Sequence, residues 1–401
     1  MKTTYLLLCL LGIGSVSGAG QTKQPQKIGD FIESTSYNEH RRNATRSLQY
    51  TPDGDDFVCI NGKNRFTRAL YGSHTAFRLE TSDRPVFAAY TKENPKHICF
   101  KLQTSGGTVA LDSTEHCESR YTAGRRSYSL SDPAFGGGSL SITTWALPDK
   151  EGAIWQFNAR NFKEFHPVLL ASISEIRNSK LNRNGDMGAD PADSFEAPLQ
   201  PQQLQSFPVQ IDGTLYILLE NQELRTLTTA EGETLFKKAE AARSETASRI
   251  RIETPDPYFN TLGGTLAMVA DGIWDGEVWL HGAIGWRMPL SGWRAAYTGD
   301  VLGWHDRART HFNAYAASQV TEVPNTLPHP AQDSALHLAR SVKKWGTPQY
   351  SNGYICRNPH RNNQMHHYDM NLCYIDELLW HFKWTGDLDY VRQMWPVITR
   401  H

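Results

Sequence analysis

The chain has 401 residues and a formal net charge of −1, from 41 Lys and Arg residues against 42 Asp and Glu residues. Its length predicts two or three domains, and its 39% hydrophobic and 21% charged content excludes wholesale disorder. Because nucleic-acid affinity depends largely on neutralising phosphates, the balanced charge argues against a nucleic-acid partner. The 11 Trp and 16 Tyr residues stand out, since their rings form flat platforms of the kind on which sugars stack.

Residues 1–19 have the pattern of a cleaved signal peptide. Lys2 supplies a positive charge, an apolar run follows from Tyr5 to Gly14, and Ser17-Gly18-Ala19 is a small-residue cleavage site. We therefore expect a periplasmic or secreted protein. The apolar run is too short to cross a bilayer and no later run is long enough, so we expect no membrane span. Since C-x-x-C and H-E-x-x-H motifs are absent from the sequence, we expect no bound metal, and we expect no cofactor.

The first half of the remaining chain has the texture of β structure. Residues 20–45 are polar and are predicted to be a linker, and residues 46–233 alternate short apolar runs with Gly, Asn and Asp. Asn61-Gly62 after Phe57–Ile60, and Asp212-Gly213 between two further apolar runs, predict β-hairpins. Ser139–Leu147 and residues 153–157 also indicate strands. This spacing favours an antiparallel β-sandwich.

The second half has the texture of helices. Residues 234–257 are rich in Ala, Glu, Lys and Arg up to two prolines, and we predict a linker helix there. Residues 258–401 show further helical periodicity. The predicted helices lie at Leu262–Trp274, Gly303–Gln319, Asp333–Trp345 and in a final pair on either side of Thr385-Gly386-Asp387.

That final pair predicts an antiparallel αα-hairpin, with Gly386 suited to the end of one helix and Asp387 to the start of the next. The predicted inner faces are Leu372, Ile375, Leu379 and Phe382 on the first helix, then Leu388, Val391, Trp395 and Ile398 on the second. The apolar pattern is unfinished at His401, so we expect the sequence to be the N-terminal part of a longer protein.

Three motifs in the second half resemble carbohydrate-active enzymes with a six-hairpin (α/α) barrel, the group of rhamnosidases, fucosidases and maltose-phosphorylase-like enzymes. They are the stretch Thr254–Asn260, the stretch Gly292–Asp300 with its GW…GD pattern, and Trp384–Asp387 followed by Met394-Trp395-Pro396. The whole chain also resembles a family of secreted bacterial proteins, domain of unknown function 4450. The resemblance implies an α+β two-domain fold: an N-terminal antiparallel β-sandwich followed by an incomplete six-hairpin (α/α) toroid.

The resemblance also implies a sugar-processing site in the helical half, with one departure. Rhamnosidase-like members carry an acidic proton donor before the GW…GD stretch, whereas Met288–Ser291 holds no carboxylate here. Glycoside hydrolysis requires two carboxyl groups. The candidate catalytic acids are Asp300, at the end of the GW…GD stretch, and Asp369, at the end of a long polar loop from Gly346.

The same stretches provide candidate substrate-binding residues, because their side chains can stack on sugars or hydrogen-bond to hydroxyls. They are Trp293, Arg294, Trp304, Arg357, Asn363, His366 and His367. Asp271, Asp275 and Glu277 form a further acidic cluster beside Trp274. The alternative for each acid is a structural role, such as a helix cap or an ion pair with arginine.

Three hypotheses for function remain open. The first is an exported glycoside hydrolase that acts on a poly- or oligosaccharide by carboxylate acid/base catalysis. The second is a polysaccharide lyase, in which His366 or Tyr368 is the base and Asn363 or Arg361 neutralises a uronate. The third is a non-catalytic carbohydrate-binding protein, which the missing carboxylate at Met288–Ser291 favours. In each case the expected partner is a carbohydrate, and the sequence leaves the oligomeric state open.

Overall fold

The computed structural model divides into two units, residues 1–48 and 49–401. It describes residues 26–28, 31–33, 49–72, 76–91, 94–148, 150–162, 166–176, 191–196, 204–282, 287–292, 295–321, 332–333, 338–339, 353–360 and 369–401. In the first unit, β1 (Gln26–Ile28) pairs antiparallel with β2 (Phe31–Glu33). This short hairpin lies inside the segment that the sequence predicted to be a polar linker.

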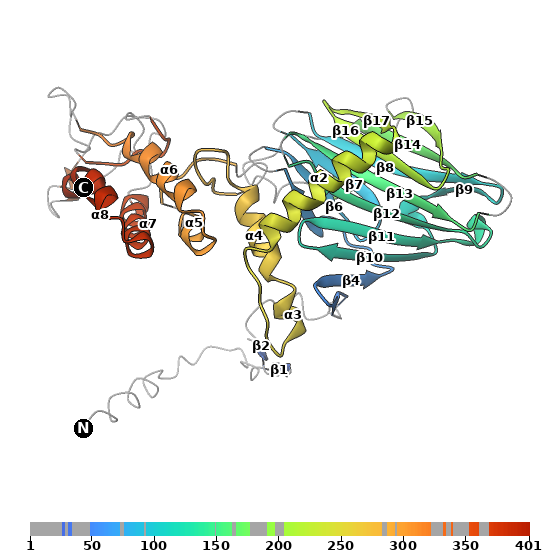
Figure 1. Ribbon diagram of the computed structural model, residues 1–401, viewed down its shortest axis with the longest axis horizontal. Helices are drawn as coiled ribbons and strands as arrows, with labels where there is room; N and C mark the ends of the chain where they lie inside the picture. Colours follow the sequence, from blue (N-terminus) through green and yellow to red (C-terminus); the bar gives the residue numbers. More distant parts are fainter. Residues whose placement is uncertain are drawn as a thin grey trace. The chain divides into compact units, whose positions relative to one another are not determined.

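The second unit contains two large antiparallel sheets (Figure 1). The eight-stranded sheet has the order β17-β16-β13-β12-β11-β10-β4-β3. Its strands are β3 (Thr51–Asp53), β4 (Asp56–Ile60), β10 (His116–Thr122), β11 (Arg125–Ser131), β12 (Ser139–Ala146), β13 (Gly152–Arg160), β16 (Thr214–Glu220) and β17 (Glu223–Leu227). The seven-stranded sheet has the order β15-β14-β8-β7-β6-β5, with β9 paired to β8. Its strands are β5 (Arg68–Tyr71), β6 (Arg78–Thr81), β7 (Val86–Tyr90), β8 (Lys96–Thr104), β9 (Gly107–Ala110), β14 (Val168–Glu175) and β15 (Gln205–Gln210).

The two sheets pack face to face around one aromatic core. Trp155 of the eight-stranded sheet contacts Phe87 and Phe100 of the seven-stranded sheet, with ring centroids 5.4 and 5.8 Å apart. Because successive strand residues point to opposite faces, every second residue of β12 and β13 enters this core. The residues between them form the outer face of the sheet. Short helical turns lie at η2 (Leu111–Ser113), η3 (Pro133–Phe135) and α1 (Pro191–Phe195).

The predicted strands are present, but the two predicted hairpins are wrong in their pairing. Gly213 has a φ of 73°, as the turn signal requires, yet β15 before it pairs with β14 and β16 after it pairs with β13. The chain therefore crosses from one sheet to the other at this turn. Asn61 also has a positive φ of 52°, and β4 before it pairs with β3 and β10 rather than with the next strand.

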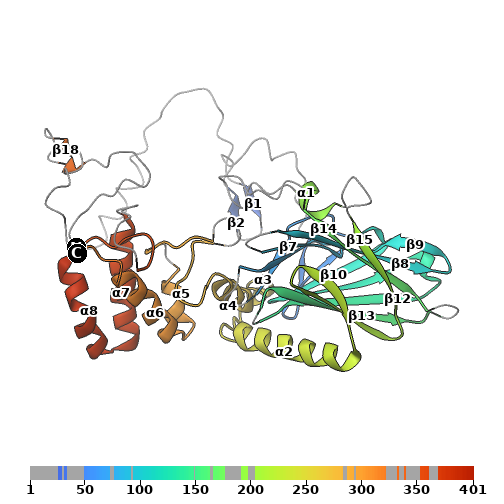
Figure 2. The same cartoon turned by 90° about the horizontal axis from the view of Figure 1, so that it is seen from above.

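One long helix covers part of the outer face of the eight-stranded sheet. Helix α2 (Thr229–Ala247) starts five residues before the predicted linker helix, because Thr228 and Glu231 form a capping box. Figure 2 shows it lying along one side of the sheets. Phe236 packs against Trp145, and Glu240 accepts a 2.7 Å hydrogen bond from the Trp145 indole. These contacts bury the apolar end of the outer face.

The second half of the expected fold class is wrong: in the part of the chain that the structure describes, no six-hairpin toroid follows the sheets. The helices there are α3 (Pro257–Asn260), α4 (Gly263–Gly272), α5 (Tyr297–Val301), α6 (His305–Ala316), α7 (Asp369–Thr385) and α8 (Leu388–Arg400). Two of them, α3 and α5, have only four and five residues, and Gly303, with a φ of 73°, separates α5 from α6. In the predicted helix at Asp333–Trp345 the described residues are instead strand residues, in β18 (Gln332–Asp333) and β19 (Leu338–Ala339).

The predicted αα-hairpin is confirmed at its turn and only in part on its inner face. Gly386 has a φ of 62°, and Asp387 accepts hydrogen bonds from the backbone N–H groups of Asp389 and Tyr390 at the start of α8. The predicted inner-face residues Ile375, Phe382 and Ile398 pack against the helical core, whereas Leu372 and Leu379 are 70% and 42% exposed. The buried face of α7 is shifted from the predicted one, because Tyr374, Leu378 and His381 also pack against α6 and α8. No helix in the described residues is long and apolar enough to cross a membrane.

Candidate functional site

The structure describes the side chains of three of the nine predicted site residues. These are Asp300, Trp304 and Arg357. Helix α7 begins at Asp369, but that side chain lies outside the described residues. The same holds for the whole of Trp293, Arg294, Asn363, His366 and His367.

Asp300 lies in α5 between two histidines from different helices. The Nδ1 atom of His305, at the start of α6, is 2.7 Å from Asp300 Oδ1. The Nδ1 atom of His381, in α7, is 2.9 and 3.0 Å from the two Asp300 oxygens. Asp300 is buried, His381 is fully buried, and His305 is half exposed. The carboxylate therefore holds three helices together as a shared hydrogen-bond acceptor.

This arrangement favours a structural role for Asp300. A general acid has to present its oxygen to the leaving group of the substrate, within about 3 Å. Both Asp300 oxygens instead face imidazole nitrogens, in a position that is 3% exposed. The structural alternative for this residue thus fits the geometry better than the catalytic one.

Trp304 and Arg357 are also engaged within the protein. The Trp304 ring is buried with the guanidinium groups of Arg249 and Arg307 over it, at 5.2 and 4.2 Å from the ring centroid. Two cations on the ring leave it unavailable for stacking on a sugar. Arg357 is half-buried beside Met288 and the carbonyl of Pro289, and burial lowers the pKa of its guanidinium.

The acids of the cluster beside Trp274 have separate partners. Asp271 is buried and forms an ion pair with Arg307 at 2.7 Å. Asp275 accepts hydrogen bonds from the backbone N–H groups of Glu277 and Val278, and Glu277 pairs with His360 at 2.6 Å. Within the described parts of the chain, no group of three or more His, Cys, Asp or Glu side chains could hold a metal ion.

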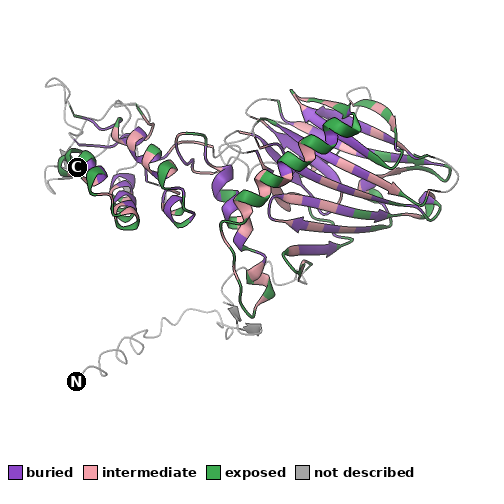
Figure 3. Cartoon of the chain, viewed as in Figure 1, coloured by how far each residue is buried: buried purple, intermediate pink, exposed green. Residues whose placement is uncertain are grey.

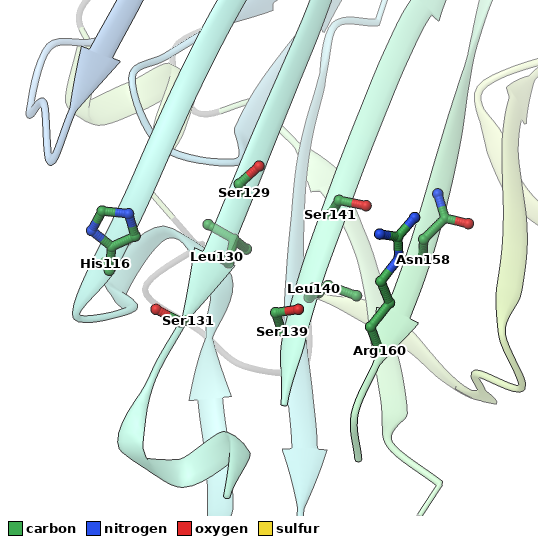
Figure 4. Close-up of a pocket in the computed structure, with 9 residues that line it drawn as sticks. All are labelled: His116, Ser129, Leu130, Ser131, Ser139, Leu140, Ser141, Asn158 and Arg160. Atoms are coloured by element: carbon green, nitrogen blue, oxygen red, sulfur yellow. The ribbon is translucent and has the colours of Figure 1, made fainter. Parts of the chain in front are cut away.

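A hollow of about 360 Å³ lies on the outer face of the eight-stranded sheet (Figure 4). It lies at the open end of this face, which is the end that α2 does not cover. Its size is within the range of small-molecule sites. It is lined by His116, Ser129, Leu130, Ser131, Ser139, Leu140, Ser141, Asn158 and Arg160. These residues come from four adjacent strands, β10, β11, β12 and β13.

Strand register explains why the polar side chains gather there. Ser129 lies opposite Ser141, Ser141 opposite Asn158, and Asn158 opposite Thr214, so one polar row crosses four strands. A second row lies at the rim, where His116 is opposite Ser131 and Ser139 is opposite Arg160. Neighbouring strands are about 4.8 Å apart, so the rim row extends about 14 Å from β10 to β13.

Most of these polar groups have no partner in the described part of the protein. The four serine hydroxyls, the Arg160 guanidinium and the His116 ring make no hydrogen bond or ion pair with a described residue. Asn158 is held in place: its amide oxygen accepts from Thr214 at 2.7 Å, and its amide nitrogen donates to Gln156 at 3.2 Å. The hollow thus presents hydroxyl, amide, imidazole and guanidinium groups to solvent.

Sequence reasoning missed this site because it searched for acids and aromatic rings in the helical half. The signal was present as period-two alternation, with serines at 127, 129 and 131 and polar residues at 139, 141 and 143. Such alternation identifies one exposed face of a sheet. It does not show that four strands place their exposed residues side by side, because strand order is set by pairing between distant segments.

Comparison with known proteins links this region to one family. Residues 95–249, less than half of the chain, match the sequence model of the family described as Domain of unknown function (DUF4450). The matched range contains all residues of the hollow and the whole of α2. This match agrees with the resemblance to that family that the sequence showed. The resemblance to six-hairpin glycosidases has no support from the comparison. No curated protein matches the chain.

Proposed function

We propose that the protein is an exported carbohydrate-binding protein that holds its ligand on the outer face of the eight-stranded sheet. The observation that carries this proposal is the polar hollow, whose hydroxyl, guanidinium and imidazole groups have no partner among the described residues. A sugar presents a series of hydroxyl groups, each of which can donate and accept hydrogen bonds. Serine hydroxyls and an oriented amide such as Asn158 can match both, since each combines donor and acceptor capacity.

The position of the hollow supports the proposal as well. A bare sheet face is usually covered by another layer, as α2 covers the apolar end of this one. At the open end the outward residues are polar, so the face is stable in water without a cover. Leu130 and Leu140 lie in the floor with their side chains in the core between the sheets, and this rigid sheet fixes the polar side chains around the hollow.

The test is a binding measurement with the full chain. We expect isothermal titration calorimetry against a panel of oligosaccharides to find a ligand, and Ser141→Leu to abolish its binding by filling the hollow with an apolar side chain. The matched control is Thr226→Leu on the edge strand β17, which is exposed and lies outside the hollow. Equal binding by both variants, with equal melting temperatures, would place the ligand elsewhere.

Glycoside hydrolysis stays a prediction from the sequence. The two carboxyl groups that it requires have to face one substrate, and in the described residues Asp300 and Asp271 are each occupied by basic side chains. Measuring reducing ends released from each glycan that binds tests the prediction directly. Turnover that Asp300→Asn abolishes, without loss of stability, would favour the hydrolase over the binding protein.

A further inference from the structure

We infer that the ligand of the hollow is an acidic glycan, whose carboxylate or sulfate group is bound by Arg160. This inference rests on the proposed function and names the substrate class. It starts from the composition of the lining: of its nine residues, Arg160 and His116 are the two that can carry a charge, and both can only carry a positive one. No carboxylate is among the lining residues.

Three acids near the hollow along the same strands and turns already have partners, and a fourth, the exposed Glu115 next to His116, lies at the opposite end of the rim row from Arg160. Glu118, two residues after His116, accepts a 2.6 Å hydrogen bond from Arg120. Asp132, next to Ser131, accepts from the backbone N–H groups of Glu115 and Ala134. Asp212, in the turn before β16, is 3.9 Å from His166. Arg160 therefore remains as a cation without a neutralising partner in the described residues.

Arginine is suited to this role because its planar guanidinium can bind a carboxylate or a sulfate through two parallel hydrogen bonds. The register places Arg160 opposite Ser139 at one end of the rim row, and His116 opposite Ser131 at the other end. A glycan chain lying along this row would meet serine hydroxyls between its two ends (Figure 4). Hydroxyls there can bind the neutral parts of the sugar while Arg160 binds the acidic group.

Matched probes separate charge from sugar structure. We would titrate the full chain with oligogalacturonate, with its methyl ester, which keeps the same sugar chain without the charges, and with chondroitin sulfate. The expected result is binding of an acidic probe at least tenfold tighter than binding of the methyl ester. Because the contact is exposed, affinity should fall as salt is raised from 50 to about 500 mM.

Substitutions at Arg160 test whether its guanidinium causes the preference for the acidic probe. Arg160→Gln should weaken binding of the acidic probe at least tenfold and leave binding of the methyl ester unchanged, and Arg160→Lys should recover part of the loss. The control is Arg225→Gln, an exposed arginine of the same sheet that pairs with Glu220 outside the hollow. Preference for carboxylate or for sulfate follows from comparing oligogalacturonate with chondroitin sulfate.

The outcomes distinguish this inference from the function on which it rests. Equal binding of charged and esterified chains, unaffected by Arg160→Gln, overturns the acidic specificity and leaves carbohydrate binding in place. Binding of no glycan, neutral or acidic, overturns both. If Arg225→Gln weakens binding of the acidic probe as much as Arg160→Gln does, the assignment to Arg160 is overturned. The attraction then comes from the net charge of the protein alone.

Discussion

Polar groups occur in two very different settings in this molecule. In the helical segment, Asp300 and Asp271 are buried and hydrogen-bonded to basic side chains of the protein. On the open end of the eight-stranded sheet, serines, His116 and Arg160 are in contact with solvent and lack partners in the described residues. Figure 3 shows how buried and exposed positions alternate along the strands and helices. Carboxylates are therefore a poor guide to function when the fold uses them to join its own elements.

The largest effect should come from removing Asp300. The change Asp300→Ala leaves His381 buried without its acceptor, which should cost about 3 kcal/mol in the free energy of unfolding. Chemical denaturation followed by tryptophan fluorescence measures this loss. The control is Asp306→Ala, because Asp306 is exposed in the first turn of α6 and should cost no more than about 1 kcal/mol. Equal effects would contradict a structural role specific to Asp300.

A second large effect should appear as pH dependence of the same segment. His311 is fully buried, and burial lowers its pKa to about 3, while its Nδ1 accepts a hydrogen bond from the Trp279 backbone. The unfolded ring takes a proton near pH 6.5, so the unfolded state binds more protons between these values. The free energy of unfolding should therefore fall by about 1.4 kcal/mol for each pH unit below 6.5, levelling off near pH 3.

The matched variant for this titration is His311→Asn, which keeps a hydrogen-bonding side chain and cannot be protonated in this range. Its stability is expected to be lower at neutral pH but to depend less steeply on pH. If denaturation curves at pH 7, 6, 5 and 4 give the same slope for both proteins, a neutral His311 is not what makes this segment acid-sensitive.

A smaller effect is expected where α2 is attached to the sheet. Burial alone would raise the pKa of Glu240, but Arg243, Arg125 and the Trp145 indole lower it below its ordinary value. Glu240→Gln removes the charge from this network and should cost about 1 kcal/mol. The lowered pKa means that the contribution is present at neutral pH and is lost on acidification. Glu233→Gln, on the exposed face of the same helix, should change stability by less than half of that amount.

The smallest effect on stability is expected at the hollow. Ser139→Ala and Ser129→Ala remove exposed hydroxyls and should change the free energy of unfolding by no more than about 0.5 kcal/mol. Their glycan affinity should nevertheless drop severalfold, as measured by calorimetry. Stability and binding should therefore depend on different regions: substitution of Asp300 should lower stability, and substitution of the serines should weaken glycan binding. A serine variant that unfolds the protein would show that the hollow has a structural purpose.

Local signals were predictable from the sequence, and non-local pairing was not. The turn at Asp212-Gly213 and the cap at Asp387 are set by neighbouring residues, and both are present. Which sheet β15 and β16 join depends on distant strands, so the hairpin prediction failed there. The inner face of α7 was predicted only in part, because Tyr374 and His381 pack against Phe312 and turn Leu372 and Leu379 outward.

The same limit applied to the candidate site: its local residue patterns were predictable, and the contacts between distant segments were not. A search for acids found Asp300, but residue type alone does not show that His381, 81 residues later, occupies the carboxylate. Polar alternation in β11 and β12 marked an exposed face, whereas the hollow forms only when β10 and β13 add His116 and Arg160 to it. Sequence could therefore predict the chemistry of each strand but not the surface that four strands form together.

Hydrogen–deuterium exchange of the full chain, with and without a bound glycan, tests the account most directly. Binding at the hollow should slow exchange in peptides that contain residues 127–131, 139–143 and 156–160, and leave residues 295–305 and 369–385 unchanged. Arg160→Gln should reduce this protection when the glycan is acidic. Protection confined to the segments around Asp300 and His381, with none on the sheet, would contradict the account.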